Sequence, residues 1–418
     1  MDIKYSPKDL ESNIYKKWMD NDCFSAKDSK ANYSIVLPPP NVTGTLHMGH
    51  AFQHTIIDIL IRYNRMLGKS VLWQPGTDHA GIATQLVVEN NLSKHGQTRH
   101  DIGRKKLVDE IWKWKEQSGN TIISQTKRLG SSADWSRNRF TMDEGSNEAV
   151  KNVFIKLYDE GLIYRGNRLV NWDIKLQTAI SDLEVKNIEK KGFLYHIKYK
   201  IKDSNKDITV ATTRPETLFG DSAICVNPND NRYKDFIGKE AIVPILNNPI
   251  PIIADEEIDI EFGTGCVKIT PAHDFNDYRL GKKHDLEFIN ILHKDGRFND
   301  NVGPIFVNKN IHESRPIVIE ELKKMESLHK VEEYKTTLPI GERSGEIVEP
   351  LLTDQWFMKM DGLAKPAIEA VKKSNIKFVP KNWEKIYFNW LNNIEDWCIS
   401  RQIWWGHRIP AWYDNNGT

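Results

Sequence analysis

The stretch PPPNVTGTLHMGH, residues 38–50, decides how the rest of this chain is interpreted. It follows an apolar run at residues 33–37 that predicts a β-strand, and its prolines end that strand because proline cannot continue the hydrogen-bond ladder. A helical pattern starts directly after it, and strand, tight loop and helix in this order present backbone N–H groups and a helix N-terminus to a phosphate, as in α/β folds. One face of the predicted helix carries Phe52, Ile56, Ile59, Leu60 and Tyr63.

Four residues of this stretch suit a nucleotide site. Gly44 and Gly49 allow the backbone to approach a ligand closely, because no Cβ intervenes. His47 and His50 can donate hydrogen bonds to phosphate oxygens. Two structural histidines near a helix start would give the same pattern, so the four letters alone leave both interpretations open. HMGH preceded by PPPNVTG resembles the HIGH signature of the class I aminoacyl-tRNA synthetases.

Composition narrows the class of protein. The chain has 418 residues, so two or three domains are expected, and its formal net charge of +1 confines any nucleic-acid contact to a local patch. Residues 1–10 contain no apolar signal-peptide core, and no apolar run approaches the ~20 residues of a membrane span, so we expect a cytoplasmic protein without membrane contact. Four cysteines lie far apart without a C-x-x-C pair, so neither disulfides nor a structural metal is expected.

A second motif, SVLWQPGTDHAGIATQ, occupies residues 70–85. Val71–Gln74 predicts a strand that Pro75 and Gly76 end, which places Asp78 at the strand's carboxyl end, where ligands bind in open α/β sheets. Its carboxylate could hold a ligand's ammonium group, or it could cap the helix that follows. The run GTDHAGIATQ resembles the valyl branch of the class I family. NVTG before the histidines and GTDHAG after them together distinguish this branch from the isoleucyl and leucyl branches.

Two further helices are predicted before the pattern changes. The first covers residues 98–130 and is charged, with a solvated face. The second covers residues 143–161, and its apolar stripe is interpreted as core: Val150, Val153, Phe154, Leu157 and Tyr158. Residues 162–173 predict a strand, a turn and a second strand.

From about Gly192 onward, short β-type runs alternate with turns, which predicts a β-rich insertion within an α/β fold. The resemblance implies a Rossmann-like, parallel-sheet catalytic domain interrupted by an editing domain, as in class I synthetases for branched aliphatic amino acids. We therefore expect a lead-in and first catalytic half at residues 1–190, the editing domain at 191–340, and the start of the second half at 341–418. Residues 287–340 are rich in charge and show no chemistry of their own.

The first motif of the insertion is ATTRPETLFGD, residues 211–221. Thr212 and Thr213 end a predicted strand, and Arg214 and Glu216 belong to the polar turn after it. Threonine hydroxyls and an arginine can bind the terminal adenosine of an RNA and an ester, although the same residues could simply cap the turn.

The second motif is GTGCVKITPAHDFNDYRLGKKHDL, residues 263–286. Lys268 lies in a predicted strand, and Asp274 and Asp277 share one face at the start of a predicted helix. Two carboxylates together could receive an α-ammonium and a small hydroxyl or orient a water, whereas the alternative is a pair that favours the helix N-terminus. The resemblance places both motifs in the editing pocket of the family.

The last motif, DWCISRQIWWGHRIP at residues 396–410, is similar to the second catalytic half of the family. Arg401 and Gln402 could face a substrate, and Trp405 could wall an aliphatic pocket or belong to the core. The lysine-bearing KMSKS signature of the family does not occur in these 418 residues. We therefore expect the chain to correspond to the N-terminal portion of a synthetase of the valyl branch.

The resemblance implies ATP-dependent activation of valine, its transfer to tRNA(Val), and hydrolysis of mischarged threonyl-tRNA(Val). Its substrates are valine, tRNA(Val) and ATP with Mg²⁺, and a monomer is expected. Alternatives are a chain active only as an editing deacylase, or an inactive tRNA-binding fragment. The implied ATP-binding residues are Pro40, Gly44, His47, Gly49 and His50, with the two histidines as the catalytic pair. The implied amino-acid-binding residues are Pro39, Asn41, Asp78 and Trp405, and the implied editing residues are Thr212, Thr213, Arg214, Glu216, Lys268, Asp274 and Asp277.

Overall fold

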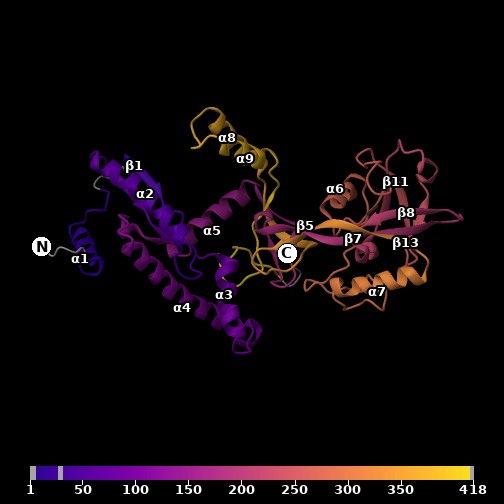
Figure 1. Ribbon diagram of the computed structural model, residues 1–418, viewed down its shortest axis with the longest axis horizontal. Helices are drawn as coiled ribbons and strands as arrows, with labels where there is room; N and C mark the ends of the chain where they lie inside the picture. The colour runs from indigo at the N-terminus through magenta and orange to yellow at the C-terminus, as the bar shows by residue number, and fades with distance from the viewer. Residues whose placement is uncertain (1–5, 27–31, 415–418) are drawn as a thin grey trace. The chain divides into compact units, whose positions relative to one another are not determined.

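The computed structural model describes residues 6–26 and 32–414, and the chain divides into two compact units (Figure 1). Unit 1 comprises the residues up to Glu160 together with those from Ile403 onward. Unit 2 comprises Gly161–Gln402. The chain therefore leaves unit 1, builds unit 2 and returns.

Unit 1 consists mainly of helices around short parallel strands. Strand β1 pairs with β2 in parallel, and β3 pairs with β4 in parallel. Helix α2 connects β1 to β2 and packs on both, so the predicted strand, loop and helix are confirmed and a second parallel strand completes a βαβ unit. The elements are α1 (Pro7–Asp20), β1 (Tyr33–Val36), α2 (Met48–Met66), β2 (Val71–Gln74), β3 (Gly76–Thr77), α3 (Gly81–Ser93), α4 (Arg99–Arg128), the 3-10 helix η1 (Trp135–Arg137), β4 (Arg139–Phe140) and α5 (Glu144–Asp159).

Helix α2 faces the strands with a side other than the apolar stripe identified in the sequence. Ile57 and Ile61 are buried in a cluster with Leu37, Val71 and Trp73. The predicted stripe is exposed, and all five of its members are more than 40% accessible: Phe52, Ile56, Ile59, Leu60 and Tyr63. The helix is apolar on two sides, so its period alone did not determine which side meets the sheet.

The apolar stripe of helix α5 was predicted to be core, and that prediction is wrong. Val150, Val153 and Tyr158 are exposed, and Phe154 and Leu157 are half-buried. The helix itself lies where it was predicted, with Asp143 as its N-cap. A stripe at helical spacing shows that a helix has an apolar face, but it does not show that this face is covered within the same unit.

Unit 2 is dominated by strands. Its elements are β5 (Ile163–Asp173), β6 (Thr178–Ile180), η2 (Asp182–Glu184), β7 (Val185–Ile201), β8 (Asp207–Thr212), η3 (Pro215–Gly220), β9 (Ala223–Val226), η4 (Lys234–Phe236), β10 (Glu240–Ile242), β11 (Pro249–Ala254), β12 (Cys266–Ile269), α6 (Phe275–Lys283), α7 (Ile311–Lys324), β13 (Leu328–Gly341), β14 (Val348–Met358), α8 (Asp361–Lys372), α9 (Trp383–Asn392) and β15 (Trp397–Cys398). The segment 162–173, predicted as two strands around a turn, forms the single strand β5, which pairs with β14 along its whole length.

Two sheets organise unit 2. The larger has the strand order β12-β9-β11-β10-β7-β13, with β8 also paired to β7, and the smaller has the order β15-β14-β5-β6. Figure 1 shows helices α6 and α7 flanking the larger sheet. One continuous cluster of buried side chains joins the two sheets, from Trp172 on β5 through Tyr199 on β7 to Leu351 on β14. None of the helices within the described residues is long and apolar enough to cross a membrane.

Candidate functional site

In unit 1, the loop at residues 38–50 is joined to the strand end at Asp78. The Asp78 N–H donates to the Pro40 carbonyl at 2.8 Å, and the Val42 N–H donates to the Asp78 carbonyl at 3.0 Å. Asn41 and Asp78 thereby form an isolated parallel bridge. The backbone therefore brings the first two motifs into direct contact, with Asn41 exposed and Pro40 buried at the junction.

Helix α4 forms three hydrogen bonds with the backbone of this loop. Trp114 Nε1 donates to the Val42 carbonyl at 2.8 Å, and Ser118 Oγ donates to the Gly44 carbonyl at 2.7 Å. Gln125 Oε1 accepts from the Leu46 N–H at 2.8 Å. Three side chains of a helix whose charges were predicted to form a solvated face thus satisfy the backbone of the candidate nucleotide loop.

His47 and His50 lie at the N-terminus of α2 with their ring centroids 4.0 Å apart. His47 is the N-cap: its Nδ1 accepts from the Gly49 N–H at 3.1 Å, and His50 Nδ1 accepts from the His47 N–H at 3.3 Å. An accepting Nδ1 places the proton of a neutral ring on Nε2. The histidines are therefore structural caps that also carry Nε2–H donors, and the two interpretations of HMGH coexist.

Gly49 is required by this arrangement. A Cβ at this position would lie 2.9 Å from His47 Cε1, whereas a Cβ at Gly44 would meet nothing within 4 Å.

Burial, followed by the neighbouring His47, lowers the pKa of His50. His50 is therefore favoured as the neutral donor near pH 7.

Asp78 is oriented by its neighbours. Its Oδ1 accepts from the Ala80 N–H at 3.1 Å and from Thr141 Oγ1 at 3.0 Å. Burial raises the pKa of Asp78, but hydrogen bonds from His79, Ala80 and Thr141 outweigh that effect and lower it. The side chain is 35% accessible, so a fixed, ionised carboxylate faces solvent where an ammonium group could bind.

The C-terminal segment of unit 1 packs beside Asp78. Gln85 Oε1 accepts from the N–H groups of Trp404 and Trp405 at 2.8 and 3.0 Å. Trp405 Nε1 donates to the His79 carbonyl at 2.9 Å, and its ring is 1% accessible and packs edge-on against Trp112. Trp405 is thus a core residue directly beneath the Asp78 strand end, and its role as a pocket wall stays a prediction.

Sequence reasoning missed three polar residues around Asp78. Thr141 forms hydrogen bonds with both Asp78 and His79. Gln85 accepts hydrogen bonds from the backbone of Trp404 and Trp405. His407 packs edge-on against His79, with ring centroids 5.1 Å apart. Arg401 and Gln402, which were expected to face a substrate, lie in unit 2. There they bond backbone and side-chain groups at Cys398, Ser400, Thr178, Ala179 and Gln355.

Unit 2 contains a pocket of about 650 Å³ between its two motifs. Both motifs contribute to its wall, and strand β13 supplies the opposite side through Tyr334–Thr337. Six of the seven predicted editing residues line it: Thr212, Thr213, Arg214, Lys268, Asp274 and Asp277. Glu216 is the exception, because it is completely buried behind the wall.

Lys268 reaches the pocket wall but is committed to buried partners. Its Nζ donates to Thr217 Oγ1 at 2.9 Å, to Asp221 Oδ1 at 2.7 Å and to Thr270 Oγ1 at 2.5 Å. The three ammonium hydrogens are therefore all used within this group. Asp221 also accepts from Tyr199 at 2.6 Å, and burial raises its pKa against the opposing effect of Lys268.

The two aspartates of α6 have different roles. Asp274 is the N-cap, and its Oδ1 accepts from the N–H groups of Asn276 and Asp277 at 2.8 and 3.1 Å. Asp277 accepts from the Thr270 N–H at 2.8 Å, and burial together with the charge of Asp274 raises its pKa to about 7. A carboxyl that titrates near neutrality and lines a pocket is suited to general base catalysis.

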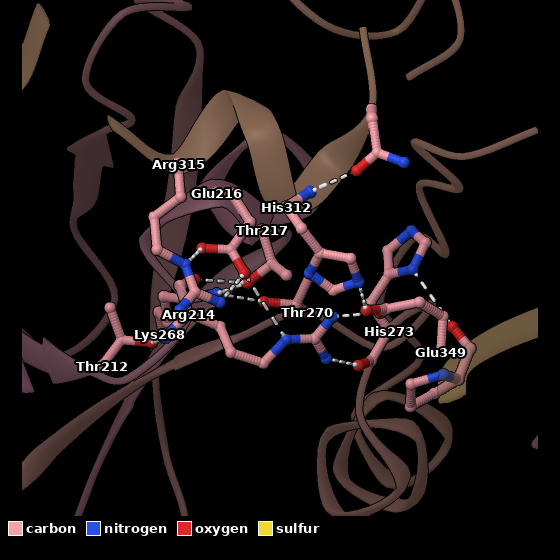
Figure 2. Close-up of polar contacts among 12 residues, drawn as sticks. Thr212, Arg214, Glu216, Thr217, Lys268, Thr270, His273, His312, Arg315 and Glu349 are labelled. Carbon is pink, nitrogen blue, oxygen red and sulfur yellow. Dashed lines mark hydrogen bonds and ion pairs between the residues drawn. The ribbon is translucent and has the colours of Figure 1, made fainter. Parts of the chain in front are cut away.

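Arg214 is held by acceptors that sequence reasoning did not identify (Figure 2). Its Nη1 donates to the His273 carbonyl at 3.0 Å, and its Nη2 pairs with Glu349 on strand β14. Glu216 binds Arg315 of helix α7 through two bonds of 2.8 and 2.6 Å. The segment 287–340, in which the sequence shows no chemistry, thus supplies a structural partner for Glu216. Nothing in the local pattern could show that Arg315 pairs with a residue 99 positions earlier.

Comparisons with known proteins agree with these motifs. The family model for class I tRNA synthetases (I, L, M and V) matches residues 13–418. A valine–tRNA ligase of Legionella pneumophila strain Paris is 57% identical over 418 residues, and one of Francisella tularensis strain SCHU S4 is 56% identical over 416. These alignments cover 100% and 99% of this chain and 45% of each relative, so the chain spans about half the length of the relatives it matches.

A solved structure is also similar. The leucyl-tRNA synthetase of Agrobacterium radiobacter K84, in a ternary complex with tRNA and LeuAMS, aligns with a TM-score of 0.40 and 18% identity, covering 80% of this chain and 48% of that one. The match of the family model over nearly the whole chain decides the assignment: the chain belongs to the class I tRNA synthetases of the I, L, M and V group.

Proposed function

We propose that this chain is part of a valine–tRNA ligase, which activates valine with ATP and transfers it to tRNA(Val). The observation that carries this proposal is the junction in unit 1, where the loop that ends in HMGH is hydrogen-bonded to the strand end that bears Asp78. A nucleotide loop and an amino-acid anchor thereby share one edge. Relatives that are 55–57% identical over almost the whole chain support valine as the amino acid.

Activation requires the carboxylate of valine to attack the α-phosphorus of ATP in line, with pyrophosphate leaving. The protein's contribution is alignment and charge stabilisation. The Nε2–H groups of His47 and His50 would donate to phosphate oxygens, backbone at Pro40, Gly44 and Gly49 would line the nucleotide, and ATP would bind as its magnesium complex. Asp78 would hold the α-ammonium group.

The side chain of valine would occupy a pocket near Pro39, Asn41 and Trp405. Valine and threonine have almost the same volume, and an apolar pocket discriminates poorly between such isosteres, for which this enzyme type is itself the standard example. We therefore propose that the pocket in unit 2 hydrolyses threonyl-tRNA(Val). The presence of Arg214, Asp274 and Asp277 on one wall supports this second activity.

In this proposal, the βαβ unit of unit 1 belongs to a Rossmann-like catalytic domain, which a β-rich editing domain at residues 191–340 interrupts. The catalytic domain then comprises residues 1–190 and the segment from 341 onward. The proposed editing set also includes Thr212, Thr213 and Lys268. Lys268 acts indirectly, because its ammonium group is bound by Thr217, Asp221 and Thr270 in the pocket wall. Glu216 is buried in the pocket wall, where it binds Arg315 and contributes negative charge near Arg214.

Two assays test the proposal on the purified chain. Valine-dependent exchange between ATP and pyrophosphate reports activation, and isoleucine activation comparable to that of valine would contradict the valine assignment. Hydrolysis of threonyl-tRNA, lost in Asp277→Ala, reports editing. A chain that hydrolyses threonyl-tRNA without exchange is an editing deacylase only, and a chain with neither activity is a binding fragment.

A further inference from the structure

Arg214 belongs to the wall of the editing pocket, and its side chain is 28% accessible. Its position at the N-cap of η3 points the guanidinium between three acceptors: the His273 carbonyl, Glu349 and Glu216 (Figure 2). The contacts with His273 and Glu349 use one N–H on each terminal nitrogen. Within the described residues, a second N–H on each of these nitrogens remains for a ligand oxygen.

Glu216 does not set this orientation. Its carboxylate is completely buried and receives both fork nitrogens of Arg315, whereas Arg214 Nε lies 3.8 Å from Glu216 Oε1. A bidentate arginine–carboxylate pair already satisfies most of the acceptor sites of Glu216. Glu216 therefore contributes charge to Arg214, and the guanidinium is fixed by its hydrogen bonds to the His273 carbonyl and to Glu349.

Glu349 is the charged one of these two acceptors. Glu349 lies on strand β14, opposite Trp172 of β5, and is 1% accessible. A buried carboxylate is costly unless a cation compensates it, and two basic side chains approach Glu349: Arg214, and His312 with its Nε2 3.3 Å from Oε1. Burial lowers the pKa of Arg214, but Glu349 and then Glu216 outweigh this effect and raise it, so Arg214 stays charged.

We propose that Glu349 is a positioning residue of the editing reaction, which fixes Arg214 so that its remaining N–H groups face an oxygen of the aminoacyl ester at the RNA 3′ end. The inference rests on the proposed hydrolysis of threonyl-tRNA. It assigns to the editing pocket a residue 135 positions from Arg214, on a strand outside the predicted insertion at 191–340. Glu349 itself touches no substrate and acts through Arg214.

The test compares Glu349→Gln with Glu346→Gln in single-turnover hydrolysis of threonyl-tRNA by the 418-residue chain. Glu346 is a matched control, because it lies three residues away and pairs with Lys175 at the surface at 3.2 Å. We expect Glu349→Gln to lower kcat/KM about tenfold or more, since it weakens a hydrogen bond between charged groups, and Glu346→Gln to change it less than about twofold.

Two further measurements separate positioning from general damage. The pH at which hydrolysis is half-maximal should stay that of the wild type, because Glu349 does not contact Asp277; a shifted midpoint would indicate a distorted pocket and contradict the inference. The double variant Arg214→Ala/Glu349→Gln should be no slower than Arg214→Ala alone, and a further loss in the double variant would mean that Glu349 acts independently of Arg214.

The remaining outcomes are also decisive. If the wild-type chain does not hydrolyse threonyl-tRNA, the proposed function and this inference both fail. If the wild type is active and Glu349→Gln equals it, the inference fails alone. Should Glu349→Gln not fold, Glu349→Asp keeps the charge but shortens the side chain by one methylene group, and wild-type kcat/KM in that variant would overturn the positioning role.

Discussion

Replacing Asp277 by asparagine should lower editing activity and raise stability at the same time. The pKa of Asp277 is raised to about 7 by burial and by Asp274. In the unfolded chain an aspartate titrates near ~4, so between roughly pH 4 and pH 7 the folded protein binds a proton that the unfolded chain has released. The free energy of unfolding therefore falls as pH rises through this window, and the loss is complete above about pH 7.

The magnitude follows from the shift. A change of about three units corresponds to roughly 4 kcal/mol at 1.36 kcal/mol per unit, which is an upper limit for the stability that the ionised Asp277 costs at pH 8. Asp277→Asn removes the charge, so its free energy of unfolding should exceed that of the wild type at pH 8 and approach it near pH 4. Urea unfolding at both pH values measures the difference.

The activity of the same variant should change in the opposite direction. If ionised Asp277 is the general base, hydrolysis of threonyl-tRNA by the wild type should rise about tenfold per pH unit below pH 7 and level off above it. Asp277→Asn should lose this limb and about 100-fold or more of the plateau rate. The assay is single-turnover hydrolysis between pH 5.5 and 8, with the spontaneous rate subtracted at each pH.

A control variant tests the electrostatic cause. Asp274→Asn keeps a good N-cap for α6, because asparagine and aspartate are comparable in that position, but removes the charge next to Asp277. The acidic limb should then move to lower pH. An Asp277→Asn variant that hydrolyses threonyl-tRNA at the wild-type rate, or one that is less stable at pH 8 than the wild type, would contradict the assignment of Asp277, with its raised pKa, as the general base.

Three further variants test other parts of the molecule. Gly49→Ala places a Cβ 2.9 Å from His47 Cε1 and should abolish most valine-dependent ATP–pyrophosphate exchange, whereas Gly362→Ala on helix α8 meets nothing within 4 Å and should retain it; equal activities would contradict the role given to the histidine cap. Trp114→Phe removes the hydrogen bond to the Val42 carbonyl and should destabilise unit 1 by about 1 kcal/mol in urea unfolding; an unchanged midpoint would show that α4 does not support the loop. Lys268→Met leaves Asp221 buried without its cation and should cost about 3–5 kcal/mol in urea unfolding, while Lys202→Met at the surface pair with Glu240 should change little; a tolerant Lys268→Met would refute the buried ion pair.

Much of the local structure of unit 1 could be predicted, because it follows from short-range chemistry. Proline ends β1, helix α5 lies where its apolar spacing predicts it, and Gly49 marks a tight approach to the His47 ring. These features depend on residues a few positions apart, so their spacing in the sequence contains the information. The side of α2 that faces the sheet depends instead on Val71 and Trp73, which lie in another segment, so the helical pattern alone does not determine it.

The wall of the pocket in unit 2 shows the same division. The closeness of Asp274 to Asp277 follows from helical spacing, and an N-cap was one of the two alternatives predicted for this pair. The partners that decide what these groups can do are distant in sequence: Asp221 for Lys268, Arg315 for Glu216 and Glu349 for Arg214. Predicting these pairs requires the strand order of unit 2, which no local pattern contains.

These distant pairs explain why three charged residues of the two motifs behave differently. Lys268 and Glu216 are neutralised by buried partners that use their hydrogen-bonding capacity, so they stabilise the wall. Arg214 is compensated by Glu349 and Glu216, but its hydrogen bonds to His273 and Glu349 use only one N–H on each terminal nitrogen, and its side chain lines the pocket. A cationic side chain can donate a hydrogen bond to a ligand only through N–H groups that its protein partners leave unused, and this distinguishes Arg214 from Lys268. Substitutions of Glu349 should therefore affect binding or turnover of the ester, whereas substitutions of Asp221 should affect folding.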